Sequence, residues 1–296
     1  MTQFRIMLNR HSAFYSPLLG TVAGGFLAEE GLDPHYGGEV PPGKSSPEML
    51  ATGELEVCQG AVSASWSYLE QGKTSPIVHF AQINERDGFF IAAREPDPDF
   101  TWNKLSGADV LADHGGQPLA MFKYGVHKMG VDYDSLNAID AGSTGEIDAA
   151  FRSGRGQYVH QQGPAPQQLE ADGLGHVVAS VGEAVGPVAF SSIQGTREFV
   201  ASDLANAFIR AYKKSRQWVN NASAEEIADK EAEFFPGIDQ SVLAHTIRFY
   251  QGLGCWNPAV EISRSSYETA LDVFLHSNLI TKRHSYDDVV VAPPAG

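Results

Sequence analysis

Apolar stretches of strand length alternate with helical stretches along the first ninety residues of the chain. Residues 4–8 (FRIML) are a short apolar run, residues 17–29 follow a helical pattern, and residues 32–36 (LDPHY) again have extended character. A second helix is expected at Ser46, which can cap it, with Pro47 in its first position. This alternation predicts a parallel, doubly wound sheet and therefore an α/β fold.

The same alternation starts again after the proline-rich segment 94–100 (REPDPDF). From Thr196 onward the pattern is almost entirely helical, up to a C-terminal tail that we expect to be frayed. We therefore predict two lobes, each a doubly wound sheet, with a ligand cleft between them and a helical C-terminal segment packed on lobe one. The expected bounds are 1–93 for the first part of lobe one, 94–187 for lobe two, and 188–296 for the return crossover and the rest of lobe one.

The charge balance argues against two classes of partner. The chain has 36 acidic and 21 basic residues and a formal net charge of −15, which repels nucleic-acid phosphates and anionic lipids. Its two cysteines, Cys58 and Cys255, sit in apolar surroundings and are expected to be buried structural thiols. Neither a metal-ligand pattern nor a nucleotide-binding glycine loop is present, so we expect no metal and no cofactor.

The sequence leaves the cellular location open. The first ten residues (MTQFRIMLNR) lack the apolar core and the cleavage site of a signal peptide. A periplasmic location is expected if an export signal has been removed from the chain, and a cytoplasmic one if the chain is complete.

Five motifs, in order, resemble one family of binding proteins. They are PLLGTVAGGFLAEEGLD, SPEMLATGELEVCQGAVSA, EIDAAFRSGRGQYVHQQGPAPQQLEADG, GPVAFSSIQGTREFV and FPGIDQSVLAHTIRFYQGLGCW. The chain is similar over nearly its whole length to the periplasmic-type solute-binding proteins of the sulfonate, nitrate and thiamine-precursor group, which includes the fungal thiamine-pyrimidine synthases. The resemblance implies the type II periplasmic-binding-protein fold, with two lobes joined by hinges that we place near residues 89–94 and 188–192.

Four loops are expected to supply the ligand-binding side chains, because ligands of open α/β sheets lie beyond the carboxyl ends of the strands. These loops are rich in aromatic, amide and imidazole groups, which suit a planar polar molecule better than a bare oxyanion. Three of the aromatic residues in these loops have an alternative to ligand binding, because Phe14, Tyr15 and Trp66 could instead pack in the core. The predicted ligand-binding residues are His11, Ser12, Phe14, Tyr15, Gln59, Ser63, Trp66, His114, Gln117, His160 and Gln161.

The function expected from these features is reversible binding of a small, planar, polar organic ligand by hinge closure. The expected ligand classes are pyrimidine-like thiamine precursors, aromatic acids and sulfonates. The resemblance implies that the protein is the substrate-binding component of an ABC-type uptake system, with a membrane permease as its partner. The alternative is a cytoplasmic enzyme on the same scaffold, with His11 or His160 as general base beside Glu39 or Asp87. The chain lacks the cysteine-rich motif of the fungal synthases, which argues against their chemistry here.

Overall fold

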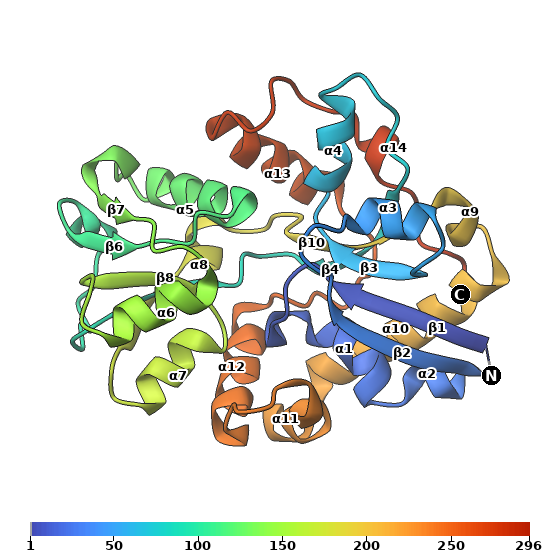
Figure 1. The fold of residues 1–296 in the computed structure, drawn as a ribbon, viewed down its shortest axis with the longest axis horizontal. Coiled ribbons are helices and arrows are strands. Elements are labelled where there is room, and N and C mark those ends of the chain that lie inside the picture. The colour runs from blue at the N-terminus through green and yellow to red at the C-terminus, as the bar shows by residue number, and fades with distance from the viewer. Residues whose placement is uncertain (1) are drawn as a thin grey trace.

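The computed structural model describes residues 2–296, which form two α/β lobes, each built on a five-stranded sheet (Figure 1). Lobe one contains, in spatial order, β2 (Leu32–Glu39), β1 (Thr2–Leu8), β3 (Val57–Gly60), β10 (Ser191–Gly195) and β4 (Val78–Asn84). Lobe two contains β7 (Asn137–Ile139), β6 (Asp109–Leu111), β8 (Tyr158–Gln162), β5 (Phe89–Ala93) and β9 (His176–Ser180). The predicted two-lobed α/β fold is confirmed.

Each sheet contains a strand that runs against its neighbours, so the expectation of purely parallel sheets is wrong. In lobe one, β10 is antiparallel to β3 and β4, and in lobe two, β5 is antiparallel to β8 and β9. Both are the first strand after the chain crosses from the other lobe. They enter their sheets from the side of the cleft, whereas β1, β3, β6 and β8 run toward it.

The chain crosses between the lobes twice, through residues 85–88 and residues 186–190. Strand β5 therefore belongs to lobe two, although the boundary drawn from the sequence placed it in lobe one. All five of its residues are buried, and such an apolar run has the same appearance in sequence whether it crosses a hinge or fills the middle of a sheet. The crossing lies just before this strand instead.

Helices cover both faces of the sheets. In lobe one the helix predicted at 17–29 is two helices, α1 (Ser16–Ala23) and α2 (Phe26–Glu29), because Gly25 between them adopts a positive φ of 75°. The other helices of the two sheet regions are α3 (Ser46–Ala51), α4 (Ser63–Leu69), α5 (Gly116–Lys128), α6 (Thr144–Arg152), α7 (Ala165–Ala171) and α8 (Val181–Val185). Short 3-10 helices span Ala13–Tyr15, Trp102–Leu105, Tyr133–Ser135 and Ala232–Phe234.

The C-terminal helices pack on lobe one and also reach lobe two. They are α9 (Arg197–Val200), α10 (Asp203–Asn221), α11 (Ala224–Glu231), α12 (Gln240–Leu253), α13 (Arg264–His276) and α14 (Tyr286–Val289). Helix α10 lies against α1 and α2, as expected, whereas α12 contacts α7 and α13 contacts α5 (Figure 1). The Tyr250 hydroxyl on α12 accepts a hydrogen bond from the Gly163 N–H (2.9 Å) and donates one to the Gly88 carbonyl (3.0 Å). This helix therefore ties a loop of lobe two to the first crossing.

The C-terminal tail is ordered against lobe one, so the prediction of a frayed end is wrong. Val290 forms a parallel β-bridge with His79 on the outer edge of β4, and the Val291 N–H donates to the His79 carbonyl at 3.1 Å. Val289 and Val290 are both buried there. Cys58 and Cys255 are buried with no disulfide, as expected. No helix within residues 2–296 is long and apolar enough to cross a membrane.

Candidate ligand-binding cleft

A cavity of about 800 Å³ lies between the two lobes, and we call it the main cleft. Its wall in lobe one comes from the loops after β1 and β3 and from the start of β10, where the strands end. Its wall in lobe two comes from β5, from the end of β8 and from the first turn of α5. The lining of the main cleft includes Asn9, Tyr15, Gln59, Ser63, Phe89, Gln117, Gln162, Phe190 and Ser191.

The lobe-one wall of the main cleft is held in place by a network of amides and hydroxyls. The Asn9 N–H donates to Gln59 Oε1 (3.0 Å), and Asn9 Nδ2 donates to the Ser46 hydroxyl (3.1 Å) and to the Gln59 carbonyl (2.7 Å). Gln59 Nε2 in turn donates to the Ser191 hydroxyl at 3.2 Å. The loops after β1 and β3 are therefore fixed relative to each other and to the returning strand β10.

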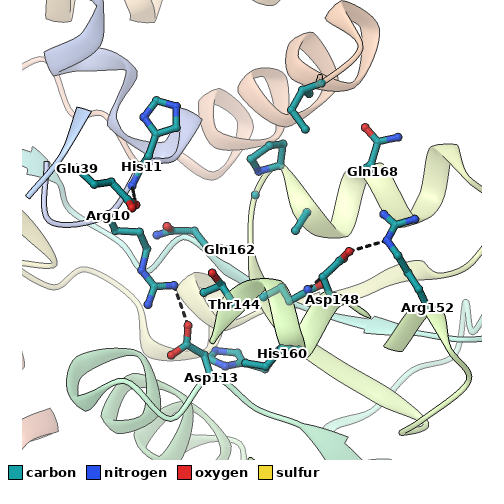
Figure 2. Close-up of a pocket in the computed structure, with 16 residues that line it drawn as sticks. Arg10, His11, Glu39, Asp113, Thr144, Asp148, Arg152, His160, Gln162 and Gln168 are labelled. Carbon is teal, nitrogen blue, oxygen red and sulfur yellow. Dashed lines mark hydrogen bonds and ion pairs between the residues drawn. The ribbon is translucent and has the colours of Figure 1, made fainter. Parts of the chain in front are cut away.

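Three side chains from the loops of lobe one, those of Arg10, Ser12 and Ser63, make polar contacts with lobe two. Arg10 Nη1 in lobe one donates to Asp113 Oδ2 in lobe two at 2.7 Å (Figure 2). The Arg10 guanidinium also lies over the Phe89 ring, 5.4 Å from its centroid. The buried Ser12 hydroxyl donates to the Gly163 carbonyl at 2.6 Å. The Ser63 hydroxyl lies 3.5 Å from Gln117 Oε1, at the limit of a hydrogen bond. The lobes are thus in contact in this structure.

A second cavity of about 300 Å³ lies on the other side of Arg10 and Gln162, the two lining residues that it shares with the main cleft. We call it the β8 chamber, since the end of β8 and the loop after it, residues 160–165, form much of its wall. Thr144, Asp148 and Arg152 of α6 line it as well, with Asp148 and Arg152 paired at 2.5 Å (Figure 2).

Burial and charge set the protonation states beside Arg10. Burial lowers the pKa of His160 to about 3, so its imidazole is neutral near pH 7. Burial alone would raise the pKa of Asp113, but the hydrogen bond and charge of Arg10 outweigh it and hold this pKa below its ordinary value. Burial raises the pKa of Asp87, deeper in the first crossing, to about 7. The Asp113 carboxyl is therefore ionised at neutral pH, where it pairs with Arg10 beside the neutral imidazole of His160.

The structure brings seven of the predicted residues to the two cavities. Tyr15, Gln59, Ser63 and Gln117 line the main cleft, and His11, His160 and Gln161 line the β8 chamber. Ser12 is buried where it joins the lobes, and it also caps the 3-10 helix that follows.

Three predicted residues lie elsewhere. Phe14 is fully buried and packs against Phe190 and Tyr250, with ring centroids 5.3 and 4.9 Å away. Trp66 is fully buried on α4 and donates to the Tyr267 hydroxyl at 2.8 Å. The core alternative is therefore the correct one for both rings. The side chain of His114 lines neither cavity, and its Nδ1 lies 2.8 Å from the carbonyl of Ala112, so its role in binding stays a prediction.

Several residues of the site were missed. Gln162 ends β8 and Asp113 lies just after β6, where a ligand was expected, whereas Ser191 begins β10; no motif distinguishes the three from their neighbours. Arg10 lies in the first predicted loop, and its importance depends on Asp113, 103 residues away in the chain. Tertiary structure alone reveals this pair.

The His–carboxylate pairs needed by the enzyme alternative are not formed. Both ring nitrogens of His11 have partners, the Tyr36 hydroxyl and the Phe234 carbonyl, each at 2.7 Å. Glu39 instead accepts from the backbone N–H of His11. Within residues 2–296 no three His, Cys, Asp or Glu side chains are grouped to hold a metal ion.

Comparison with known protein families identifies the group to which the chain is related. The family model described as NMT1/THI5 like matches residues 15–226. The chain belongs to the NMT1/THI5-like family. This NMT1/THI5-like chain is also 30% identical over 295 residues to YtlA of Bacillus subtilis (strain 168). The name of YtlA describes it as a candidate binding protein. The alignment covers 98% of this chain and 88% of YtlA. The family resemblance stated from the sequence motifs is confirmed.

Solved structures of binding proteins share the fold of this NMT1/THI5-like protein. The alkanesulfonate-binding protein SsuA of Xanthomonas axonopodis pv. citri has a TM-score of 0.74 at 15% identity, with 99% of each chain covered. The aliphatic sulphonate-binding protein SsuA of Escherichia coli has a TM-score of 0.75 at 15% identity, with 99% and 93% covered. The nitrate-binding protein NrtA of Synechocystis PCC 6803 has a TM-score of 0.63 at 14% identity, with 100% and 93% covered. Such likeness establishes the periplasmic-binding-protein fold.

Proposed function

We propose that this protein binds a small, planar, polar organic solute in the main cleft and closes its two lobes around it. The observation that carries the proposal is a cavity of about 800 Å³ whose walls come from both lobes, within the size range of small-molecule sites. Residues 85–88 and 186–190, where the chain crosses between the lobes, would act as the hinges. A solute that contacts both walls binds the closed form better than the open form, and this difference shifts the equilibrium toward closure.

The lining of the main cleft supports the proposed solute class. Tyr15, Phe89 and Phe190 offer aromatic surface, which suits the faces or edges of a flat ring. Asn9, Gln59, Ser63, Gln117 and Gln162 offer neutral donors and acceptors, which suit the polar edges of a heterocycle or aromatic acid.

A bare oxyanion fits this lining less well. Arg10, which lines the main cleft, is already paired with Asp113. Lys44 and Lys73 also line the main cleft, but Lys44 pairs with Glu54 and is half-exposed, and Lys73 donates to Gln71. An anionic solute would therefore have to compete with partners already present.

The proposed biological role is that of the substrate-binding component of an ABC-type uptake system. Two structural neighbours are named as binding proteins for alkanesulfonates and for nitrate, and a third is a ligand-binding component of an ABC-type import system from Staphylococcus aureus. By analogy, the closed and loaded form would be recognised by a membrane permease, which is the proposed partner.

A thermal-shift screen followed by native mass spectrometry tests the proposal. The screen covers pyrimidines, thiamine precursors, aromatic carboxylates and alkyl sulfonates, and each hit is recovered and its mass measured. A compound that raises the melting temperature and is recovered unchanged supports a binding protein. Recovery of a chemically altered compound would instead establish the enzyme alternative, and the absence of any hit would contradict the proposed solute class.

A further inference from the structure

The end of β8 presents three consecutive polar side chains that are buried without their full set of hydrogen bonds. His160, Gln161 and Gln162 are 0%, 5% and 8% exposed, and all three line the β8 chamber. Both ring nitrogens of His160, Oε1 of Gln161 and both amide heteroatoms of Gln162 have no partner within residues 2–296. Unpaired polar atoms are costly to bury, so a group of them at one cavity wall is expected to meet something that pairs with them.

Packing holds the first of these side chains rigidly. The His160 ring lies between those of Phe89 and Phe122, with centroids 4.6 and 4.5 Å away and interplanar angles of 23° and 12°. Two phenyl faces cannot satisfy imidazole nitrogens, whose hydrogen bonds lie in the plane of the ring. The sandwich therefore fixes the direction in which the imidazole offers one donor and one acceptor.

The two arginines that line the chamber are already paired with carboxylates. Arg10 pairs with Asp113 at 2.7 Å, and Arg152 pairs with Asp148 and Asp172 at 2.5 and 2.6 Å. Gln161 Nε2 lies 3.3 Å from Asp148 Oδ1. The hydrogen-bonding capacity that remains consists of amide oxygens, one amide NH₂ group, a neutral imidazole and the carboxylate of Glu39, which accepts from the backbone N–H of His11.

The chamber is distinct from the main cleft. The two cavities share only Arg10 and Gln162 among their lining residues, and the Arg10–Asp113 pair spans the lobes between them. At about 300 Å³ the chamber lies at the lower end of the volumes of small-molecule sites, so its occupant is small.

We propose that the β8 chamber is a second binding site, separate from the main cleft, for a small uncharged molecule of the amide or urea class. Such a molecule has N–H donors and a carbonyl acceptor side by side. The N–H groups meet Oε1 of Gln161 and Gln162, and the carbonyl accepts from Gln162 Nε2 or from the protonated ring nitrogen of His160. An anionic molecule would meet the Glu39 carboxylate and would have to break one of the two ion-pair systems first.

The test uses nicotinamide and N-methylurea as probes in saturation-transfer NMR with the full-length chain. His160→Phe keeps an aromatic ring between Phe89 and Phe122 but removes both nitrogens, and Gln161→Met keeps the side-chain length but removes the amide. Gln117→Met is the matched control in the main cleft, because the Gln117 amide donates to the Phe190 carbonyl there and does not line the chamber. Thermal melting of each variant checks that it folds.

We expect at least one probe to bind the wild-type chain. The dissociation constant should rise by at least about tenfold in His160→Phe and in Gln161→Met, since each removes hydrogen bonds from a buried site. It should stay unchanged in Gln117→Met. Failure of both probes to bind, or retention of binding in both chamber variants, would overturn the proposal. Loss of binding in Gln117→Met alone would also overturn it, because the probe would then occupy the main cleft.

Discussion

Arg10 and Asp113 form an ion pair of 2.7 Å that joins the two lobes between the main cleft and the β8 chamber. Asp113 is nearly buried, with 7% of its side chain exposed, and the pKa of this carboxyl is held below its ordinary value by Arg10. The pair therefore stabilises the arrangement in which the lobes touch.

Arg10→Met should shift the protein toward an open form. Removing the guanidinium leaves the Asp113 carboxylate unpaired in the closed arrangement, at a cost of about 1–3 kcal/mol to that arrangement. Small-angle X-ray scattering should show a larger radius of gyration than for the wild type. Arg264→Met is the control, because the Arg264–Asp287 pair is exposed, with 65% and 71% of the two side chains accessible. Identical scattering from Arg10→Met and wild type would contradict a lobe-joining role.

Tyr15→Phe should weaken binding of the solute in the main cleft by about 0.5–1.5 kcal/mol, the usual contribution of one hydrogen bond. The Tyr15 phenol lies beside the side chains of Gln162 and Ser191, and its ring is 2% exposed. Tyr15→Ala should weaken binding by more than about 1 kcal/mol, since an aromatic contact is lost as well. It should also destabilise the fold, because the ring is buried.

Isothermal titration calorimetry with a hit from the screen measures both affinities. If Tyr15→Phe binds this solute as tightly as the wild type does, the hydroxyl has no part in recognition and Tyr15 serves packing alone.

Trp66→Phe should lower stability and leave the dissociation constant of the solute unchanged. The substitution removes the hydrogen bond from the Trp66 indole to the Tyr267 hydroxyl and leaves a void where the larger ring packed against Phe274. A loss of about 1–3 kcal/mol in the free energy of unfolding is expected from chemical denaturation. If a Trp66→Phe variant that is fully folded under the assay conditions bound the solute more weakly, Trp66 would have a role in solute binding after all.

Glu231 should make stability fall as pH rises. Its carboxyl is fully buried, and burial raises its pKa to about 8, while the Ser16 hydroxyl donates to it at 2.7 Å. The folded state therefore holds a proton that the unfolded state releases near pH 4.5. Its contribution to stability is complete below that pH and is lost as pH rises through about 8.

Glu231→Gln removes this titration and keeps the shape of the side chain. Denaturant unfolding at about pH 5 and about pH 8 should show a drop of at least about 2 kcal/mol in the wild type that is smaller in the variant, because each unit of pKa shift corresponds to about 1.4 kcal/mol. Equal drops in both proteins would show that other groups control the pH dependence.

The sequence carried most of the information about the fold, because the periods of strands and helices are local properties. Strand β5 was assigned to the wrong lobe because a fully buried strand lacks the polar alternation that shows where a sheet begins. The order of the tail could not be predicted, because the partner of Val290 is His79, which is distant in the sequence, and no local pattern indicates this contact.

The candidate site was predicted as a set of loops better than as a set of side chains. Strand ends identify the loops, and His160 and Gln161, which were predicted in this way, line the β8 chamber. An aromatic residue beside a helix start has the same sequence signature whether it faces a ligand or the core, so Phe14 and Trp66 could not be assigned. The Arg10–Asp113 pair joins two loops that are close only when the lobes meet.

The β-bridge between His79 and Val290 has a consequence for how copies of this protein meet. Strand β4 is the last strand on its side of the lobe-one sheet, and an open edge of this kind offers backbone groups to the strand of another molecule. The chain's own C-terminal residues occupy part of that edge, with the Val291 N–H already bonded to the His79 carbonyl. These C-terminal residues therefore block that part of the β4 edge from pairing with a strand of another molecule.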